Sequence, residues 1–421
     1  MKLGLRLRSI ALVEQLGPGL VTGAADDDPS GIATYSQAGA QFGFGLLWTM
    51  VLTYPLMSAV QLVSARIGRV TGCGLARNMA KVLPRWLILM LVGLLFIGNT
   101  INIGADLAAM GSAAELSIGI SAHVMTVLFA VVSLLLQLFI AYPRYASFLK
   151  WLTLVLLFYV AVLLVIKIDW ASVGIGLIVP RVSGATAVTT IVAIFGTTIS
   201  PYLFFWQSAQ EVEEVAQDEE AEPLKKEPWQ ARRELRRIRL DTLVGMGVSN
   251  LVAIAIIIAT AASLHANGKM SIETAADAAR ALEPVAGRFA FALFSLGIVG
   301  TGLLAVPVLA GSAAYAVGES NGWKCGLEHK PWEATGFYAV IAAATLIGIA
   351  IDWSPLDPIK ALFWSAVVNG IVAVPIMAAM MVVVTRRKLM GKFVASLRLQ
   401  VLGWTATLIM AAAAVAMLVV R

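Results

Sequence analysis

Residues 22–39 read TGAADDDPSGIATYSQAG and place three consecutive aspartates, Asp26 to Asp28, inside a stretch that is otherwise apolar or small. Mostly apolar or small residues continue on both sides, over 10–25 and 32–40. An aspartate at the centre of a bilayer costs about 2.5–3.5 kcal/mol, whereas each leucine or isoleucine returns only about 0.3–0.6 kcal/mol. We therefore expect these carboxylates to face a wet cavity or a cation. The alternative is that they mark the outer end of a span, followed by a re-entrant segment.

The rest of the chain has the composition of a membrane protein. Of its 421 residues, 59% are hydrophobic and 13% are charged, whereas soluble proteins average about 25% charged residues. The mean hydropathy of +0.84 excludes a disordered, collagenous or secreted disulfide-rich protein, and a soluble enzyme has no place for so much apolar surface. Two cysteines, Cys73 and Cys325, are too few for a disulfide framework or a four-ligand zinc site. A lipid bilayer is therefore the expected environment.

Roughly twenty apolar residues are needed for a helix to cross the hydrocarbon core. Eleven stretches meet this requirement, so the sequence predicts an all-α polytopic membrane protein with eleven transmembrane helices. Their approximate limits are 10–39, 44–65, 86–112, 121–142, 149–167, 187–208, 241–264, 285–316, 333–352, 360–384 and 399–420. The whole chain, 1–421, is then a single transmembrane domain, and its basic start belongs to the first helix instead of a cleaved signal peptide.

The basic residues indicate how these helices are oriented. Lys and Arg accumulate in cytoplasmic loops, and with a cytoplasmic N-terminus only seven of the 31 basic residues lie outside. Those seven are Lys167, Arg181, Lys269, Arg280, Arg288, Lys360 and Arg421. The expected location is the cell (plasma or inner) membrane, with the C-terminus extracytoplasmic. The net charge of +6 is then a topology signal, and no nucleic-acid partner is expected.

The longest polar insertion, 211–239, combines an acidic part, EVEEVAQDEEAEP, with a basic part, KKEPWQARRELRRIR. We expect a charged cytoplasmic loop there, with a short amphipathic helix on the inner membrane face. An alternative is that Glu211, Glu213 and Glu214 draw cations toward a cytoplasmic vestibule.

Pro29 predicts a break in the first helix. A proline removes one backbone donor, clashes with the preceding turn and moves Asp28 away from helical geometry, and Gly31 adds flexibility. The break frees carbonyls such as that of Ala25 to act as oxygen ligands beside the carboxylate. Irregular backbone survives at membrane depth only where it lines a cavity or is buried in protein.

A second break is predicted in residues 191–210, IVAIFGTTISPYLFFWQSAQ. A lone proline in a membrane helix usually makes only a kink. Two matched interruptions, each in the first helix of a set of five, instead indicate inverted repeats with a binding site at the bilayer midplane. We expect repeat one over about 10–167, repeat two over about 187–384, and an additional helix over about 399–420.

At these two breaks the sequence resembles the Nramp family of divalent-metal transporters, which have a leucine-transporter-like fold of two inverted five-helix repeats. The family pattern Asp-Pro-Gly-Asn corresponds here to Asp-Pro-Ser-Gly at 28–31, and Met-Pro-His corresponds to Ser-Pro-Tyr at 200–202. The resemblance extends over essentially the whole chain, including an eleventh helix. It implies alternating-access transport of a metal ion as substrate, with no cofactor.

The resemblance also implies a set of metal-site residues. These are Asp28, Gly31, Ala25, Thr197, Ser200 and, as an aid to Asp28, Asp27. The family's methionine ligand is replaced by Ser200, and loss of a soft thioether removes the main chemical reason to reject magnesium. Gly31 replaces an asparagine ligand, so we expect a wider pocket that suits a largely hydrated ion. The sequence is most similar to the Nramp-related magnesium transporter branch, whose members carry Mg²⁺ and also Mn²⁺.

Proton coupling in the resembled family uses a histidine and a glutamate that are absent here. Tyr202 and Ala109 stand at those two positions, and tyrosine does not titrate near neutral pH. Asp106, Asn102 and Asn369 remain as polar residues within spans. Each is either an interhelical hydrogen-bonding residue or, for Asp106, part of the pathway, because an intramembrane carboxylate needs a partner. We therefore predict transport without proton coupling.

Three alternatives stay open at this point. One is a proton-coupled Mn²⁺ or Fe²⁺ importer that uses Asp106 or Asp27 as its proton site. Another is an amino-acid carrier on the same fold, although an aspartate triplet repels a substrate carboxylate. An intramembrane enzyme is disfavoured because the three histidines, His123, His265 and His329, fall in loops or at helix ends. The expected partners are the divalent ion and the lipid bilayer, with no obligatory protein partner.

Overall fold

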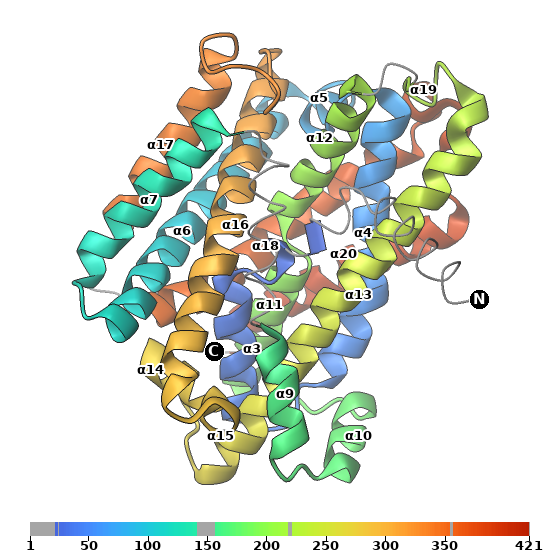
Figure 1. The fold of residues 1–421 in the computed structure, drawn as a ribbon. Coiled ribbons are helices and arrows are strands. Elements are labelled where there is room, and N and C mark those ends of the chain that lie inside the picture. The colour runs from blue at the N-terminus through green and yellow to red at the C-terminus, as the bar shows by residue number, and fades with distance from the viewer. Residues whose placement is uncertain (1–21, 24, 141–155, 218–220, 354–356, 421) are drawn as a thin grey trace, which may run out of the picture.

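The computed structural model describes residues 22–23, 25–140, 156–217, 221–353 and 357–420 (Figure 1). This part of the chain is helical and contains no strand. Its α-helices are α3 (Pro29–Phe42), α4 (Trp48–Thr71), α5 (Leu75–Ala80), α6 (Arg85–Ile118), α7 (Ala122–Phe139), α9 (Leu157–Val165), α10 (Trp170–Ile178), α11 (Gly184–Thr198), α12 (Pro201–Gln217), α13 (Ala231–Ser263), α14 (Ala275–Ala279), α15 (Glu283–Ala286), α16 (Ala290–Asn321), α17 (Thr335–Ile351), α18 (Pro358–Thr385), α19 (Arg387–Met390) and α20 (Leu397–Val419). Short 3₁₀ turns are η2 (Pro228–Gln230), η3 (His265–Asn267), η4 (Arg280–Leu282), η5 (Gly287–Phe289) and η6 (Gly391–Phe393).

The predicted spans match these helices closely. Within the described residues, eight helical segments are long and apolar enough to cross a membrane, and Thr335–Ala350 is a shorter apolar helix. Each of them overlaps one predicted span. The predicted first and fifth spans, 10–39 and 149–167, fall partly outside the described residues. From the first span the structure describes helical residues at 22–23 and 25–26 and α3, and from the fifth it describes α9.

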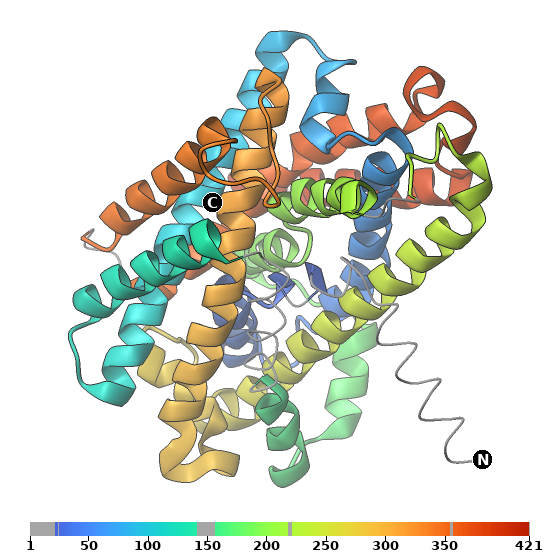
Figure 2. The same cartoon turned by 45° about the horizontal axis from the view of Figure 1, so that its top comes forward.

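The helices are arranged in an inner and an outer set. α3 is mostly buried and contacts α11, α13 and α18. It lies in the interior of the bundle in both views (Figures 1 and 2). By contrast, only 28% of the apolar window of α7 and 22% of that of α20 is buried. Because lipid is as apolar as a protein core, α7 and α20 can expose apolar side chains at the periphery while the polar residues of α3 stay inside.

Glycine allows one of the closest helix contacts in the bundle. A Cβ atom on Gly196 in α11 would lie 1.9 Å from the carbonyl oxygen of Ala366 and 2.4 Å from the backbone nitrogen of Gly370 in α18. Small residues at such contacts let helix backbones approach, which is the main source of packing energy between membrane helices. This contact fixes the end of α11 just before the second break.

The prediction of a charged loop over 211–239 is wrong in its extent. Residues 211–217 complete α12, and α13 begins at Ala231, so the connection is much shorter than the charged segment. Basic residues 232–239 are therefore the first two turns of a 33-residue helix. Charged side chains do not prevent helix formation here, because they pair across helices.

That pairing produces a charged cluster, which we define as Arg69, Glu211, Glu214, Glu234 and Arg237. Arg237 Nη2 lies 2.8 Å from Glu211 Oε2 and 2.6 Å from Glu214 Oε2, and its Nε lies 3.1 Å from Glu234 Oε2. Arg69 in α4 lies 3.0 Å from Glu234. The cluster therefore ties together α4, α12 and α13 at one end of the bundle.

These contacts do not support the alternative that the glutamates attract cations from solution. Glu211 is fully buried and paired with Arg237. Glu213 accepts hydrogen bonds from the Tyr315 hydroxyl and, at 2.8 Å, from the backbone N–H of Leu327. Both carboxylates are committed to interactions within the protein.

Candidate metal-binding site

The first helix is interrupted beside Asp28, as predicted. Asp28 has extended backbone geometry (φ −69°, ψ 169°) and is the N-cap of α3, with Pro29 at the first helical position. Its Oδ1 accepts hydrogen bonds of 2.7 Å from the Gly31 backbone N–H and the Ser30 hydroxyl. Aspartate and proline are favoured at these two positions of a helix start, so the local sequence places the carboxylate at the break.

The second predicted break is also present. α11 ends at Thr198, Ile199 leaves helical geometry (φ −117°, ψ 56°), and α12 begins at Pro201. The Ser200 hydroxyl oxygen lies 2.8 Å from the carbonyl oxygens of both Gly196 and Thr197, and either carbonyl can accept its single proton. Its oxygen lone pairs remain available to a cation. The hydroxyl of Thr197 is buried and has no hydrogen-bond partner.

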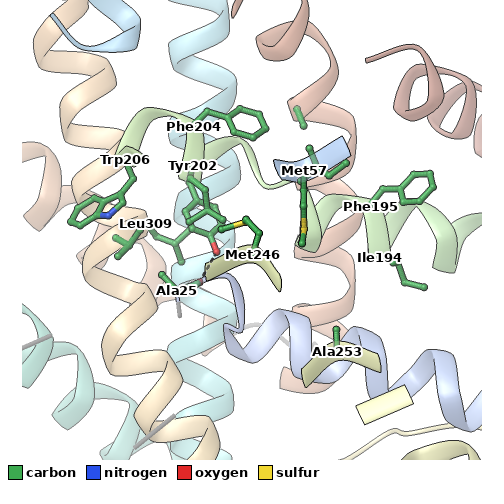
Figure 3. Packing of buried hydrophobic residues seen from close by; sticks show 14 of the residues in the cluster. Ala25, Met57, Ile194, Phe195, Tyr202, Phe204, Trp206, Met246, Ala253 and Leu309 are labelled. Atoms are coloured by element: carbon green, nitrogen blue, oxygen red, sulfur yellow. Dashed lines mark hydrogen bonds between the residues drawn. The ribbon is translucent and has the colours of Figure 1, made fainter. Parts of the chain in front are cut away.

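Tyr202 connects the two breaks. Its hydroxyl donates a 3.1 Å hydrogen bond to the carbonyl oxygen of Ala25, and Figure 3 shows the side chain pointing from α12 toward Ala25. The Ala25 carbonyl retains a second lone pair. The carbonyl of Ala25, on the N-terminal side of the first break, is therefore oriented by a tyrosine that follows the second break.

A polar network joins Asp28 to α6 and α18. One amide, Asn102 Nδ2, donates to Asp28 Oδ2 at 3.2 Å and to Asp106 Oδ2 at 3.0 Å. Asn369 Nδ2 donates to Asn102 Oδ1 at 2.9 Å. The two asparagines thus make interhelical hydrogen bonds, and Asp106 lies one side chain away from Asp28. Ala109, one turn further along α6, is buried and apolar.

Asp26 and Asp27 turn toward a different helix. Ser249 Oγ in α13 lies 2.8 Å from Asp26 Oδ2 and 3.0 Å from Asp27 Oδ1. Asp26 Oδ1 is buried without a partner. Ser249 was not predicted as a site residue, because serine is common inside apolar spans. The adjacent polar residues at 249–250 were the only local indication of it.

The buried carboxylates of the site have no basic partner. Asp26, Asp27, Asp28 and Asp106 are at most 6% exposed, and no basic side chain in the described part of the chain forms an ion pair with any of them. Buried carboxylates need paired charge or protons. Across the described residues no three His, Cys, Asp or Glu side chains converge as a ligand set. The geometry therefore suits one carboxylate, that of Asp28, supplemented by neutral oxygens.

The expected wider pocket beside Gly31 is not present in this conformation. A Cβ atom on Gly31 would lie 3.1 Å from Thr197 Oγ1, 3.3 Å from Tyr35 Cε2 and 3.4 Å from the Asp26 carbonyl oxygen. The space left by the missing side chain is filled by Thr197 and Tyr35. A roomier site requires these two side chains or their helices to move apart.

This arrangement of two facing breaks agrees with the match to a known family. A family model described as Natural resistance-associated macrophage protein-like (Nramp) matches residues 19–420. The chain belongs to the Nramp family. The family was predicted from the residues at 28–31 and 200–202, and that prediction is confirmed.

Curated relatives of this Nramp chain are transporters. The divalent metal cation transporter MntH of Acidiphilium cryptum is 28% identical over 394 residues, which cover 89% of this chain and 83% of the relative. MntH of Burkholderia ambifaria is 25% identical over 415 residues, covering 96% and 88%. The relatives are named as transporters and not as enzymes, in agreement with the sequence prediction.

Solved structures show the same fold. The manganese transporter of Eremococcus coleocola, in complex with an aromatic bis-isothiourea substituted compound, has a TM-score of 0.73 at 17% identity, covering 96% of this chain and 86% of that one. The nucleobase-cation-symport-1 family transporter Mhp1, in a closed conformation with bromovinylhydantoin bound, has a TM-score of 0.60 at 13% identity, covering 96% and 91%. The predicted leucine-transporter-like fold of this Nramp chain is thereby confirmed.

Proposed function

We propose that this Nramp-family chain transports divalent metal cations, Mg²⁺ as well as Mn²⁺, by alternating access around Asp28. The observation that carries the proposal is the group of buried, unpaired carboxylates where two interrupted helices meet. A divalent cation supplies the missing positive charge. Relatives named as divalent metal cation transporters support the substrate class.

The proposed ligands are the Asp28 carboxylate, the Ala25 and Thr197 carbonyl oxygens and the Ser200 hydroxyl, with Asp27 nearby. All of these are hard oxygen donors, which suit Mg²⁺ and Mn²⁺. Gly31 contributes no side-chain ligand. Mg²⁺ keeps several of its waters and touches only one or two carboxylates, so a single anchoring aspartate agrees with transport of a largely hydrated ion.

The proposed topology follows the distribution of basic residues. The N-terminus and the charged cluster are cytoplasmic, and the C-terminus is extracytoplasmic, in the cell membrane. Repeat one comprises about 10–167, repeat two about 187–384, and the additional helix about 399–420. In support, the chain is interrupted beside Asp28 and again between α11 and α12, close to the proposed starts of the two repeats.

A thioether at position 200 is expected to change selectivity. Ser200→Met places a soft sulfur ligand beside Asp28 and is expected to shift the preference for Mn²⁺ over Mg²⁺ on the order of tenfold, equivalent to about 1.4 kcal/mol. Competition between the two ions for uptake into proteoliposomes measures this ratio. Ser200→Ala removes the hydroxyl without adding sulfur and serves as the control. An unchanged ratio in Ser200→Met would show that selectivity is set elsewhere.

Transport is expected to be independent of a proton gradient. The membrane potential contributes about 2.3 kcal/mol per elementary charge at 100 mV, so a divalent ion gains about 4.6 kcal/mol without protons. Proteoliposomes with an entrapped metal indicator and an entrapped pH indicator should show uptake that rises with an inside-negative potential. The lumen should not acidify as the metal enters.

One observation favours the alternative of a proton-coupled Mn²⁺ or Fe²⁺ importer. Asp106 is fully buried and joined to Asp28 through Asn102, and its Oδ1 has no hydrogen-bond partner. Acidification of the lumen in step with uptake, lost in Asp106→Asn, would establish this alternative. The same assay therefore decides between the two functions.

A further inference from the structure

A cavity with both charged and apolar lining residues lies at the end of the bundle opposite the charged cluster. Its volume is about 510 Å³, within the range of about 300–1,000 Å³ that ligand sites occupy. It is bounded by residues 42–46 after α3, by α10 and by the C-terminal end of α13. Figure 1 shows α10 at the opposite end of the molecule from α5 and α12. The cavity is therefore separate from the proposed metal site.

Two cationic side chains line this cavity without a partner. Lys167 and Arg181 flank α10, and neither forms an ion pair with any residue in the described segments. Both belong to the seven basic residues that the topology places outside. Asp169 is the one acidic residue that lines the cavity, so its lining carries more positive than negative charge.

Asp169, the acidic residue that lines the cavity, is the N-cap of α10. Asp169 Oδ1 accepts hydrogen bonds from the backbone N–H groups of Ala171 and Ser172 at 3.1 and 3.3 Å, and Oδ2 accepts from the Ser172 hydroxyl at 2.6 Å. These hydrogen bonds lower the pKa of Asp169, and the bond from the Ser172 hydroxyl has the largest effect. Its carboxylate caps the helix and does not pair with Lys167 or Arg181.

An apolar surface borders the charged cavity. α10 contains no charged residue and exposes Trp170, Ile175 and Ile178, which are 59%, 48% and 79% accessible. Ile175 also lines the cavity. A short apolar helix with tryptophan at its start and basic residues at both ends is typical of a segment lying in the membrane interface.

We propose that this cavity binds the phosphate group of an anionic phospholipid, with its acyl chains lying along the apolar face of α10. The two cations supply the charge that complements a headgroup phosphate, and a tryptophan beside basic residues is typical of a segment at the level of the headgroups. Free phosphate shares the anionic chemistry, but only a lipid also covers Ile175 and Ile178. The bound lipid contacts the segment that follows α3, the helix that Asp28 caps.

Binding of phosphatidylglycerol to the purified full chain in detergent, followed by native mass spectrometry, tests this proposal. Lys167→Gln combined with Arg181→Gln is expected to weaken binding by about thirtyfold, because each basic residue contributes about 1 kcal/mol to an anionic membrane surface. The control is Arg288→Gln combined with Lys360→Gln. It also removes two positive charges from the extracytoplasmic side, but neither residue lines the cavity, so lipid binding should be unchanged. Equal melting temperatures without lipid show that all variants are folded.

Two further measurements distinguish binding of a lipid headgroup from binding of free phosphate. Millimolar inorganic phosphate should not displace the lipid, and Ile175→Gln with Ile178→Gln should weaken lipid binding while leaving Lys167 and Arg181 in place. Displacement by free phosphate, with no effect of the isoleucine changes, would overturn the lipid assignment. Equal binding by the Lys167/Arg181 double variant and wild type would overturn the site itself.

Discussion

Asp28→Asn is expected to abolish metal uptake while leaving the fold intact. Asparagine has nearly the same volume and is an equally good N-cap, so the hydrogen bonds from Ser30 and Gly31 to Oδ1 can persist. Only the negative charge that anchors the cation is lost. Mg²⁺ and Mn²⁺ uptake into proteoliposomes should fall by at least about a hundredfold, which corresponds to about 2.8 kcal/mol.

The chain contains a closely matched control for this substitution. Asp357 precedes Pro358 at the start of α18, and its carboxylate caps that helix by accepting from the Ile359 backbone N–H at 2.9 Å. Asp357→Asn makes the same chemical change at the same kind of helix start, away from the two breaks. It should transport at the wild-type rate. If Asp28→Asn took up metal at the wild-type rate, Asp28 could not be the residue that anchors the cation.

Arg237→Ala is expected to cause the largest loss of stability. The substitution leaves Glu211, which is fully buried, and its neighbour Glu214 without their partner. Removing one partner of a buried ion pair costs about 3–5 kcal/mol, because the remaining charge stays desolvated. Thermal unfolding of the protein in nanodiscs should show a clearly lower midpoint than wild type.

Two further variants test whether the lost ion pairing causes the destabilisation by Arg237→Ala. Arg233 contacts the same glutamate, Glu234, at 2.7 Å, but its side chain is 71% exposed, so Arg233→Ala should cost at most about 1 kcal/mol. Adding Glu211→Gln to Arg237→Ala removes both charges and should recover part of the loss. Equal destabilisation by Arg233→Ala and Arg237→Ala would contradict this account of the cluster.

Much of the fold was predictable because membrane helices satisfy their own backbone hydrogen bonds. Length and hydropathy therefore placed α18 within two residues of its observed bounds, and α6 and α16 within six. The breaks were predictable for a local reason, since proline and its neighbours determine backbone geometry at Asp28 and Ser200. No long-range information was needed for these features.

What the sequence did not predict depends on contacts between distant helices. The charged segment was expected to be a loop because its composition is polar, yet Arg237 pairs with Glu211 and Glu214 on another helix. Ser249 binds Asp26 and Asp27 from more than two hundred residues away in the chain. The space at Gly31 is filled by Thr197 and Tyr35, which no pattern within the first helix indicates.

Anomalous diffraction from crystals of the full chain soaked in Mn²⁺ would locate the bound metal ion. We expect an anomalous peak beside the Asp28 carboxylate, between the first turn of α3 and the junction of α11 with α12. The peak should disappear in Asp28→Asn and persist in Asp357→Asn. A metal peak that lies elsewhere, or that survives unchanged in Asp28→Asn, would contradict the account.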